Sequence, residues 1–573
     1  MESNCNRRPI LPSVHLESNR QSKLGKSHRT ILVYSGILFL YLVLRLLVWQ
    51  STILLEDTDS LFYLESIKTY LTFNLQEINS LNPDSTPFYP FFGALCTLPG
   101  LSVETGARLC SLLFSVVLFL AVLGIAKRGK NLQAAALALL ILALSPSLIS
   151  LSVSVLTEPS YIATVYLGFW FFLSNYENPK SWTGGVLGIL CALAFLNRTE
   201  GLLYLILLPF LQGLHLLFVK NKTYSLKQYL GWTLTFAICF SIIATPQILH
   251  VSRKMGTFAI NGRQAWRLID KNLVGYSDSE KIFGLNFSDR HINIKYARMS
   301  YSDLREQFAS TKRNSIVNNV KLFYRNIKKT YKIHVIRSMG IIGFALFFIG
   351  IIGNYQEGFR FETLLLVLFI CFSLLPSLTQ PTKYLLLRHI LIIFPMIIFF
   401  QARGIIYICK KLLKSHQNPA GFELIISMVL LLLLLTAFLP QLKNILSFRS
   451  YNKEYNTAEL KTPSDIVMQI VTKENLSSPT LAAQRGYLSY YTQSKQEYLP
   501  YCDYDAFVKW CSLNNVEFVY LNHRRVHGYP FFTEFLMGRG VVDFILLYRG
   551  ADKNGKPVEL YRFNKPYLDT IHE

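Results

Sequence analysis

Charged residues are scarce in this sequence. Only 16% of its 573 residues are charged, whereas 51% are hydrophobic, and the mean hydropathy is +0.30. A soluble protein carries a charged share nearer to about 25%. Apolar runs of roughly 20 residues recur along the chain, which is the length that a helix needs to cross a bilayer. The sequence therefore predicts a polytopic, all-α integral membrane protein rather than a string of soluble domains.

Acidic residues are the rarer of the two charge types, with 35 Asp and Glu against 58 Lys and Arg, and the net charge is +23. In a soluble protein this excess would suggest nucleic acid as a partner. The sequence has no zinc-type cysteine spacing, no nucleic-acid motif and no long basic run. We therefore expect the cations to meet anionic membrane lipids, and we expect no nucleic-acid partner.

Metal-ligand patterns and paired cysteines are also missing. No cluster of His, Asp or Glu has convincing ligand spacing, so the sequence supports no divalent cation and predicts no cofactor. The nine cysteines are scattered, and only Cys502 and Cys511 lie close together outside the apolar runs. If they flank one helix, the rise of about 1.5 Å per residue separates them beyond disulfide reach, so we expect no bridge.

The apolar runs predict about eleven membrane helices. The two shortest, 159–174 and 182–197, are compatible with tilted helices or with helices partly buried in protein. The expected spans are 31–50, 104–126, 132–150, 159–174, 182–197, 201–219, 229–250, 334–353, 361–378, 386–402 and 421–440.

Lysine and arginine favour alternate loops between these spans, and this bias predicts the orientation of the chain. The basic tail 1–30 is expected in the cytoplasm, with no cleavable signal peptide, because the run after it is too long for one. The membrane domain then covers 31–440, with long outer loops at 51–103 and 251–333. An odd number of helices places 441–573 outside the cytoplasm.

The segment 441–573 has a mixed pattern that predicts a small soluble α/β domain. Thr480 to Gln484 and Val516 to Leu521 are expected strands, and Ala506 to Trp510 is an expected helix.

The first outer loop is the most informative segment. It opens with Asp57 and Asp59, whose carboxylates either begin a solvated loop or face a substrate or a headgroup. Residues 60–73 then have the amphipathic spacing of a helix that lies in the membrane interface. Residues 87–90, Pro-Phe-Tyr-Pro, are expected to form a rigid aromatic turn at the membrane surface.

A series of loose motifs follows in order along the chain, each at an outer end in the expected topology. They are Asp59 with Tyr63, Tyr89 within 87–90, Ala107-Arg108-Leu109, Pro146, Thr157-Glu158, Arg198-Thr199-Glu200-Gly201, and Tyr384, Arg388, His389 and Pro395. Their order and placement resemble those of the GT-C glycosyltransferases, in particular the family-39 group of protein O-mannosyltransferases and lipid A aminoarabinose transferases.

The resemblance implies a GT-C-type bundle and an inverting transfer of a sugar, a hexose or a pentose, from a polyprenyl-phosphate donor to an acceptor outside the cytoplasm. Asp59 is then the general base, because a carboxylate must take the acceptor's proton. Cations must hold the phosphate leaving group, and arginine matches its geometry. The implied phosphate-binding residues are Arg198, Arg388, His389 and Lys383, and the supporting residues are Asp57, Tyr63, Tyr89, Glu158, Glu200 and Arg108.

The sequence also departs from the family pattern. Ser60 follows Asp59 where the family often has Glu, and the Lys-Pro-Pro stretch of the aminoarabinose transferases is replaced by Thr86-Pro87-Phe88. The second departure argues against aminoarabinose as the sugar. The sugar, the acceptor (lipid, glycan or protein) and the chain length of the donor stay open, and a bacterial or archaeal plasma membrane is favoured over the endoplasmic reticulum.

Each candidate residue also has a plain structural alternative. Arg108 and Arg198 can extend to the interface as ordinary flanking cations, Glu158 can be a helix-entry residue, and His389 can be a packed helix residue. Asp57 can share the role of Asp59, which is preferred for its spacing to Tyr63. At the level of the whole protein, the alternative is a transporter or flippase of lipid-linked sugars, which would favour broken helices near the bilayer midplane.

The topology is testable with a reporter that fluoresces only in the cytoplasm, fused after Glu573. We expect no fluorescence, because the charge bias puts the C-terminus outside. A control fusion before Met1 should be bright. A bright C-terminal fusion would contradict the topology and the outward-facing site.

Overall fold

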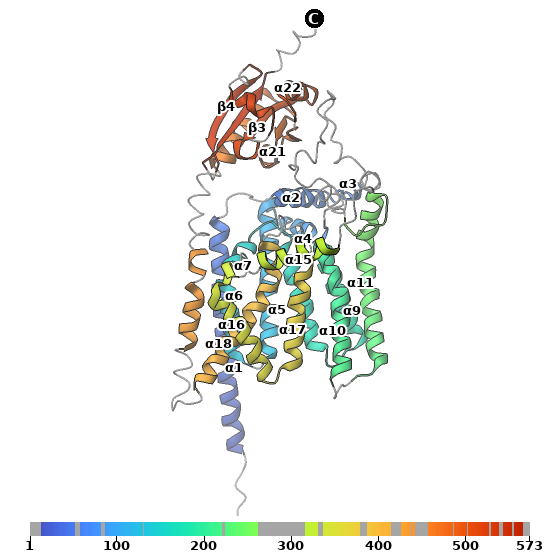
Figure 1. The fold of residues 1–573 in the computed structure, drawn as a ribbon, viewed down its shortest axis with the longest axis vertical. Helices are drawn as coiled ribbons and strands as arrows, with labels where there is room; N and C mark the ends of the chain where they lie inside the picture. The colour runs from blue at the N-terminus through green and yellow to red at the C-terminus, as the bar shows by residue number, and fades with distance from the viewer. Residues whose placement is uncertain are drawn as a thin grey trace, which may run out of the picture.

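The structure is a computed structural model of the chain. It describes residues 13–51, 58–81, 86–129, 131–219, 224–261, 316–330, 336–378, 387–413, 426–436, 438–441, 457–484, 486–500, 502–526, 529–537, 542–552 and 555–564. Figure 1 shows a bundle of roughly parallel helices, with a small sheet-containing domain beyond one end. We call this the capped end. The first turns of α1 lie at the opposite end (Figure 1).

Six helical segments in the described residues are long and apolar enough to cross a membrane: Thr30–Trp49, Val103–Arg128, Thr199–Phe218, Leu226–Met255, Ser338–Gln356 and Leu391–Leu412. Shorter apolar helices accompany them. The expectation of a mostly helical integral membrane protein is confirmed, but the expected number of about eleven spans is not. The bundle helices are α1 (Ser13–Ser51), α5 (Val103–Arg128), α6 (Leu132–Leu144), α8 (Glu158–Asn175), α9 (Ser181–Asn197), α10 (Leu203–Phe218), α11 (Leu226–Met255), α16 (Ile336–Gln356), α17 (Arg360–Leu378) and α18 (Phe394–Leu413).

Two of the expected spans differ from the structure at proline residues. The run 132–150 is divided into α6 and α7 (Pro146–Leu151), because Pro146 has no N–H to continue the helix and instead begins a new one. The expected span 386–402 was placed too early. Two single 3₁₀ turns, η4 (Leu387–His389) and η5 (Leu391–Ile393), precede α18, in which Pro395 occupies the first turn.

The first outer loop forms three short helices that lie across the capped end (Figure 1). They are α2 (Thr58–Leu71), α3 (Leu75–Ser80) and α4 (Phe88–Thr97). α2 matches the expected amphipathic helix, with Leu64 and Ile67 fully buried against the bundle. The expected aromatic turn at 87–90 is wrong: Pro87 is the N-cap of α4 and Pro90 lies in its first turn, where a missing N–H costs nothing.

The domain beyond the capped end contains a five-stranded sheet of order β2-β1-β3-β5-β4. Strands β2 (Lys495–Tyr498), β1 (Thr480–Ala483) and β3 (Val516–Asn522) are parallel, whereas β5 (Pro557–Phe563) and β4 (Phe544–Ala551) are antiparallel to their neighbours. The expected strands and the expected helix, within α22 (Tyr504–Leu513), are present. Cys502 and Cys511 are both free thiols. The remaining helices of this domain are η6 (Thr457–Lys461), α20 (Thr462–Glu474), α21 (Tyr487–Thr492), α23 (His523–Val526) and α24 (Phe532–Leu536).

A short helix joins the two parts of the molecule. Tyr487 of α21 is buried in the same apolar cluster as Leu64 and Ile67 of α2. The ammonium group of Lys68, in the last turn of α2, lies 4.3 Å from the ring centroid of Tyr490. α2 is therefore held between the bundle and the sheet domain.

Glycines allow close crossings inside the bundle. A Cβ at Gly188 of α9 would collide with the backbone carbonyl of Phe236 in α11 and would lie 3.1 Å from the nitrogen of Phe240. At Gly168 of α8 the nearest atom to such a Cβ is 3.6 Å away, which is ordinary contact. Small residues at such crossings let helix backbones approach within the membrane.

We predict that Gly188→Ala destabilises the bundle by about 1–3 kcal/mol, because the two helix backbones must separate. Gly168→Ala is the matched control and should be neutral or slightly stabilising, since alanine favours helix by about 1 kcal/mol over glycine. Thermal unfolding of both variants in detergent measures the difference. Equal melting temperatures would show that the α9–α11 contact does not depend on Gly188.

Candidate active site

Four chain segments meet at the capped end. They are the first turn of α2, the start of α8, the break between α9 and η1 (Thr199–Leu202), and η4. Each is a place where a helix begins or ends. Pro159 in the first turn of α8 fixes one start. The extended backbone of Arg198, with φ −154° and ψ 137°, interrupts the helix between α9 and η1.

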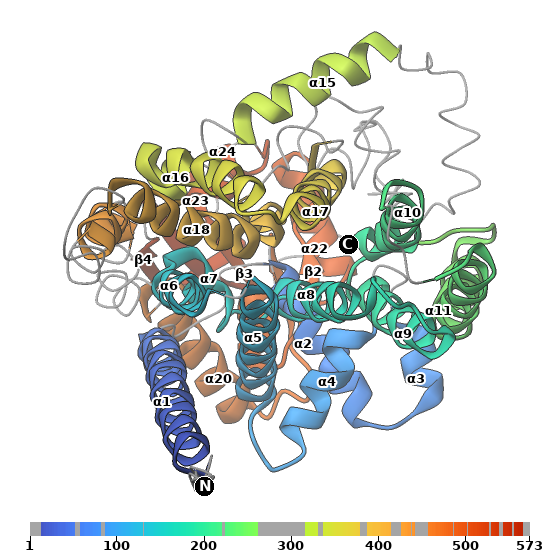
Figure 2. The same ribbon diagram turned by 90° about the horizontal axis from the view of Figure 1, so that it is seen from below.

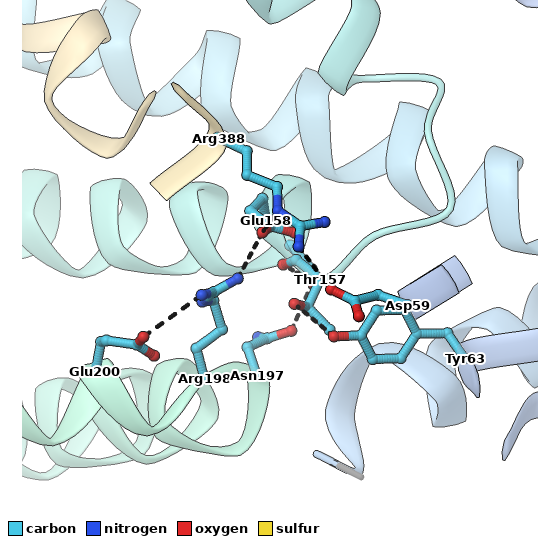
Figure 3. Close-up of polar contacts among 9 residues, drawn as sticks. Asp59, Tyr63, Thr157, Glu158, Asn197, Arg198, Glu200 and Arg388 are labelled. Atoms are coloured by element: carbon cyan, nitrogen blue, oxygen red, sulfur yellow. Dashed lines mark hydrogen bonds and ion pairs between the residues drawn. The ribbon is translucent and has the colours of Figure 1, made fainter. Parts of the chain in front are cut away.

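Glu158 is the centre of an ion-pair network in this place (Figure 3). Its Oε1 accepts a hydrogen bond of 2.6 Å from Nη1 of Arg198 and lies 3.7 Å from Nε of Arg388. The other nitrogens of these arginines continue the network. Nη2 of Arg388 donates to Oδ2 of Asp59 at 2.7 Å, and Nη2 of Arg198 lies 3.4 Å from Oε1 of Glu200. Three carboxylates and two guanidinium groups therefore alternate through the site.

The network is largely removed from water. The side chain of Glu158 is 4% exposed and those of Arg198 and Arg388 are 12% and 19% exposed, whereas that of Asp59 is 38% exposed. Burying charges is costly unless they are paired, so these groups stabilise one another. Asp59 is the most solvent-exposed of these four residues, so another molecule can reach its carboxylate.

A pocket of about 350 Å³, counted out to its open mouth, opens beside the two arginines. Its lining combines charged groups with apolar side chains and the hydroxyls of Tyr161 and Ser373. It is lined by Glu158, Tyr161, Ile162, Arg198, Glu200, Ser373, Pro376, Arg388, His389 and Ile392. The pocket lies near the capped end of the bundle. Because its lining is part charged and part apolar, it suits an amphiphile with a charged head and an apolar tail.

His389 lies in η4, just before the span that contains α18. Burial and then the positive charge of Arg198 lower the pKa of the His389 imidazole to about 4. The ring is therefore neutral near pH 7. It can donate one hydrogen bond to an anion in the pocket, but it does not add a third positive charge.

Hydroxyl and amide groups support the charged residues. The hydroxyls of Tyr63 and Thr157 lie 3.4 Å apart, which ties α2 to the residue that precedes Glu158. Ser160 donates to Oδ1 of Asn197 at 2.5 Å and so joins α8 to the residue before Arg198. Figure 3 shows Asn197 beside Arg198. Sequence reasoning missed Ser160 and Asn197 as site residues; their positions beside Glu158 and Arg198 were the available signal.

Not every predicted site residue lies in this place. Tyr89 is fully buried behind Tyr63, with ring centroids 5.7 Å apart, and its hydroxyl donates to the carbonyl oxygen of Ala107. It therefore packs behind the site. Arg108 forms an ion pair of 2.6 Å with Glu104 and does not line the pocket.

The other predicted site residues fall into two groups. Asp59, Tyr63, Glu158, Arg198, Glu200, Arg388 and His389 converge as described, and their roles stay predictions. Asp57 and Lys383 lie outside the described residues. Within the part of the chain that the structure describes, no group of three or more His, Cys, Asp or Glu side chains could hold a metal ion.

Two solved proteins, ArnT and the oligosaccharyltransferase AglB, have a fold similar to this one. ArnT from Cupriavidus metallidurans, solved bound to undecaprenyl phosphate, superimposes with a TM-score of 0.55 at 12% identity over 94% of this chain and 99% of that one. AglB, the oligosaccharyltransferase of Archaeoglobus fulgidus, solved with an inhibitory peptide and a dolichol-phosphate, gives 0.52 at 13% identity over 92% and 74%.

Sequence comparison agrees with the fold. Residues 84–248 match the family model described as dolichyl-phosphate-mannose-protein mannosyltransferase. No curated protein is similar enough in sequence to count as a match. The resemblance that the motifs predicted, to the GT-C glycosyltransferases and their protein O-mannosyltransferase group, is therefore confirmed. The matched segment contains Tyr89, Arg108, Glu158, Arg198 and Glu200, whereas Asp59 and Arg388 lie outside it.

The network predicts a large stability loss for Glu158→Gln, which keeps the shape but leaves two buried arginines without their shared anion. We expect a cost of about 3–5 kcal/mol, seen as a lower melting temperature in detergent. The matched control is Glu177→Gln near the other end of α8, where Glu177 pairs with Arg128 at 3.5 Å on the surface. An exposed pair contributes only about 0–1 kcal/mol. Equal shifts for both variants would contradict a buried hub at Glu158.

Proposed function

We propose that this protein is a membrane glycosyltransferase that moves a sugar from a polyprenyl-phosphate donor to an acceptor outside the cytoplasm, with inversion at the sugar carbon. One observation carries the proposal. The pocket is lined by two largely buried arginines, and one of them, Arg388, contacts the partly exposed carboxylate of Asp59 at 2.7 Å. Groups that can bind a phosphate and a carboxylate that can accept a proton are thereby held at adjacent positions.

The arginines are the proposed phosphate ligands. Guanidinium groups bind phosphate oxygens in a bidentate manner, and in a pocket largely removed from water this attraction is strong. Both arginines already contact carboxylates, so a donor phosphate must compete with Asp59 and Glu200 for their outer N–H groups. The ArnT structure holds undecaprenyl phosphate and the AglB structure a dolichol-phosphate, which supports a lipid of this class as the donor here.

Asp59 is the proposed general base. Its carboxylate takes the proton of the acceptor's hydroxyl or amine as the acceptor atom bonds to the sugar's anomeric carbon. At the same time the bond from that carbon to the phosphate oxygen breaks, and the electron pair leaves on the polyprenyl phosphate. Attack from the face opposite the phosphate inverts the configuration. When the donor phosphate takes Arg388, Asp59 is released from its ion pair and becomes available to the acceptor.

Glu158 and Tyr63 are proposed to position these groups. Glu158 keeps Arg198 and Arg388 on one side of the pocket, and the contact of Tyr63 with Thr157 holds the first turns of α2 over it. Neither residue needs to touch the reacting atoms. Tyr89 supports Tyr63 from behind through an edge-on ring contact.

A transporter or flippase of lipid-linked sugars is the second function considered. The transporter pattern places ionisable groups near the bilayer midplane. Here the network of Asp59, Glu158, Arg198 and Arg388 lies at helix ends beside α2, which favours surface chemistry over passage through the bundle. We propose that the site lies outside the cytoplasm, a placement that rests on the charge bias of the loops, and that the membrane is a plasma membrane.

We expect Asp59→Asn to abolish transfer while donor binding survives. The amide keeps the size of the side chain but cannot accept the proton, and loss of a general base costs about 10²–10⁴-fold in rate. Polyprenyl-phosphate affinity should be unchanged or higher, because Arg388 loses a competing anion. The measurement is consumption of radiolabelled polyprenyl-phosphate sugars by membranes that contain each variant, with donor binding assayed separately.

The matched control is Glu65→Gln, which removes a carboxylate from the exposed face of the same helix. It should retain near wild-type transfer. Asp57→Asn tests whether the neighbouring carboxylate shares the role, and it should cost much less than Asp59→Asn. A folded Asp59→Asn protein with near wild-type transfer would remove the proposed base.

A further inference from the structure

One helix of the capped end has no part in the proposed chemistry. α15 (Ile316–Lys329) contains four basic residues and no acidic one: Lys321, Arg325, Lys328 and Lys329. Figure 2 shows it outside the ring of bundle helices, crossing the directions of α16 and α17. In Figure 1 it lies at the level of α4. A helix in this position lies across the bundle near the membrane surface rather than through the membrane.

Three sectors can be distinguished around this helix. Lys321, Arg325 and Lys328 are exposed and follow each other at intervals of four and three residues, so they form one stripe. Tyr324, 69% exposed, and Ile327, 41% exposed, lie beside this stripe. An exposed cationic stripe next to exposed apolar side chains is the pattern of a helix that lies in the membrane interface.

The third sector anchors the helix to the bundle. Asn326 is fully buried, and its Nδ2 donates a hydrogen bond of 2.8 Å to the carbonyl oxygen of Leu378, the last residue of α17. The same end of α17 supplies Ser373 and Pro376 to the pocket. The position of α15 is therefore fixed relative to the mouth of the site.

We propose that α15 is a docking helix for anionic phospholipid headgroups of the leaflet that faces the site. Its cationic stripe contacts the lipid phosphates, and Tyr324 and Ile327 enter the boundary of the acyl chains. The three like charges of the stripe repel one another, and an anionic surface offsets this repulsion.

The test uses the full chain in proteoliposomes and does not depend on activity. Tyr324→Trp introduces a reporter at an exposed position, and its signal is the difference from the parent, which has six tryptophans. Acyl-chain-brominated phosphatidylglycerol and brominated phosphatidylcholine, at equal mole fraction, are the quenchers. We expect phosphatidylglycerol to quench the reporter about two-fold more strongly, because the basic stripe enriches anionic lipid near it.

Two sets of substitutions distinguish the effect of the basic stripe on lipid preference from the effect of the protein's overall positive charge. Lys321→Gln, Arg325→Gln and Lys328→Gln together, in the reporter background, should make the two lipids quench equally. Lys473→Gln, Lys509→Gln and Lys556→Gln remove the same charge from exposed positions of the sheet domain and should leave the preference intact. Salt of about 1 M should weaken the preference, because it shortens the screening length to about 3 Å.

Each result decides the proposal. Equal quenching of the reporter by both lipids shows that α15 does not select anionic headgroups, and no quenching shows that it does not lie on the bilayer. A preference that survives neutralisation of the stripe also overturns it. Because none of these outcomes involves sugar transfer, they do not depend on whether the proposed glycosyltransferase activity is right.

Discussion

The contact on which this structure depends is the pairing of Glu158 with two arginines from distant parts of the chain. Glu158 begins α8, Arg198 is the C-cap of α9, and Arg388 lies in η4, the first of the two 3₁₀ turns before α18. A carboxylate only 4% exposed is stable as an anion only with cations against it. The helix ends that carry these charges are therefore held together, and the pocket is formed where they meet.

The same pairing prepares the site for a phosphate. Arginines that are already held between carboxylates do not have to be reoriented when a donor binds, because their positions are already set. The most exposed partner, Asp59, is the one that a phosphate displaces at the lowest cost. In the proposed mechanism, the donor phosphate takes the place of Asp59 on Arg388 and frees this carboxylate, so donor binding precedes deprotonation of the acceptor.

Much of this could be predicted from the sequence, for identifiable reasons. The apolar runs and the strand patterns depend on local composition, and Asp59, Glu158, Arg198 and Arg388 were found because each belongs to a short motif at a helix end. The pairing among them was not predictable, since residues 59 and 388 are brought together only by the fold. Run length did not reveal that Pro146 and Pro395 lie at helix starts inside the expected spans 132–150 and 386–402, and Pro87 begins a helix where a turn was expected.

The most direct measurement of the central claim is an experimental structure of the protein with polyprenyl phosphate bound. The account predicts phosphate oxygens within hydrogen-bond distance of Arg198 and Arg388, with the contact between Arg388 and Asp59 broken and the contact between Arg198 and Glu158 kept. A phosphate bound away from both arginines, with the Asp59–Arg388 ion pair intact, would contradict it.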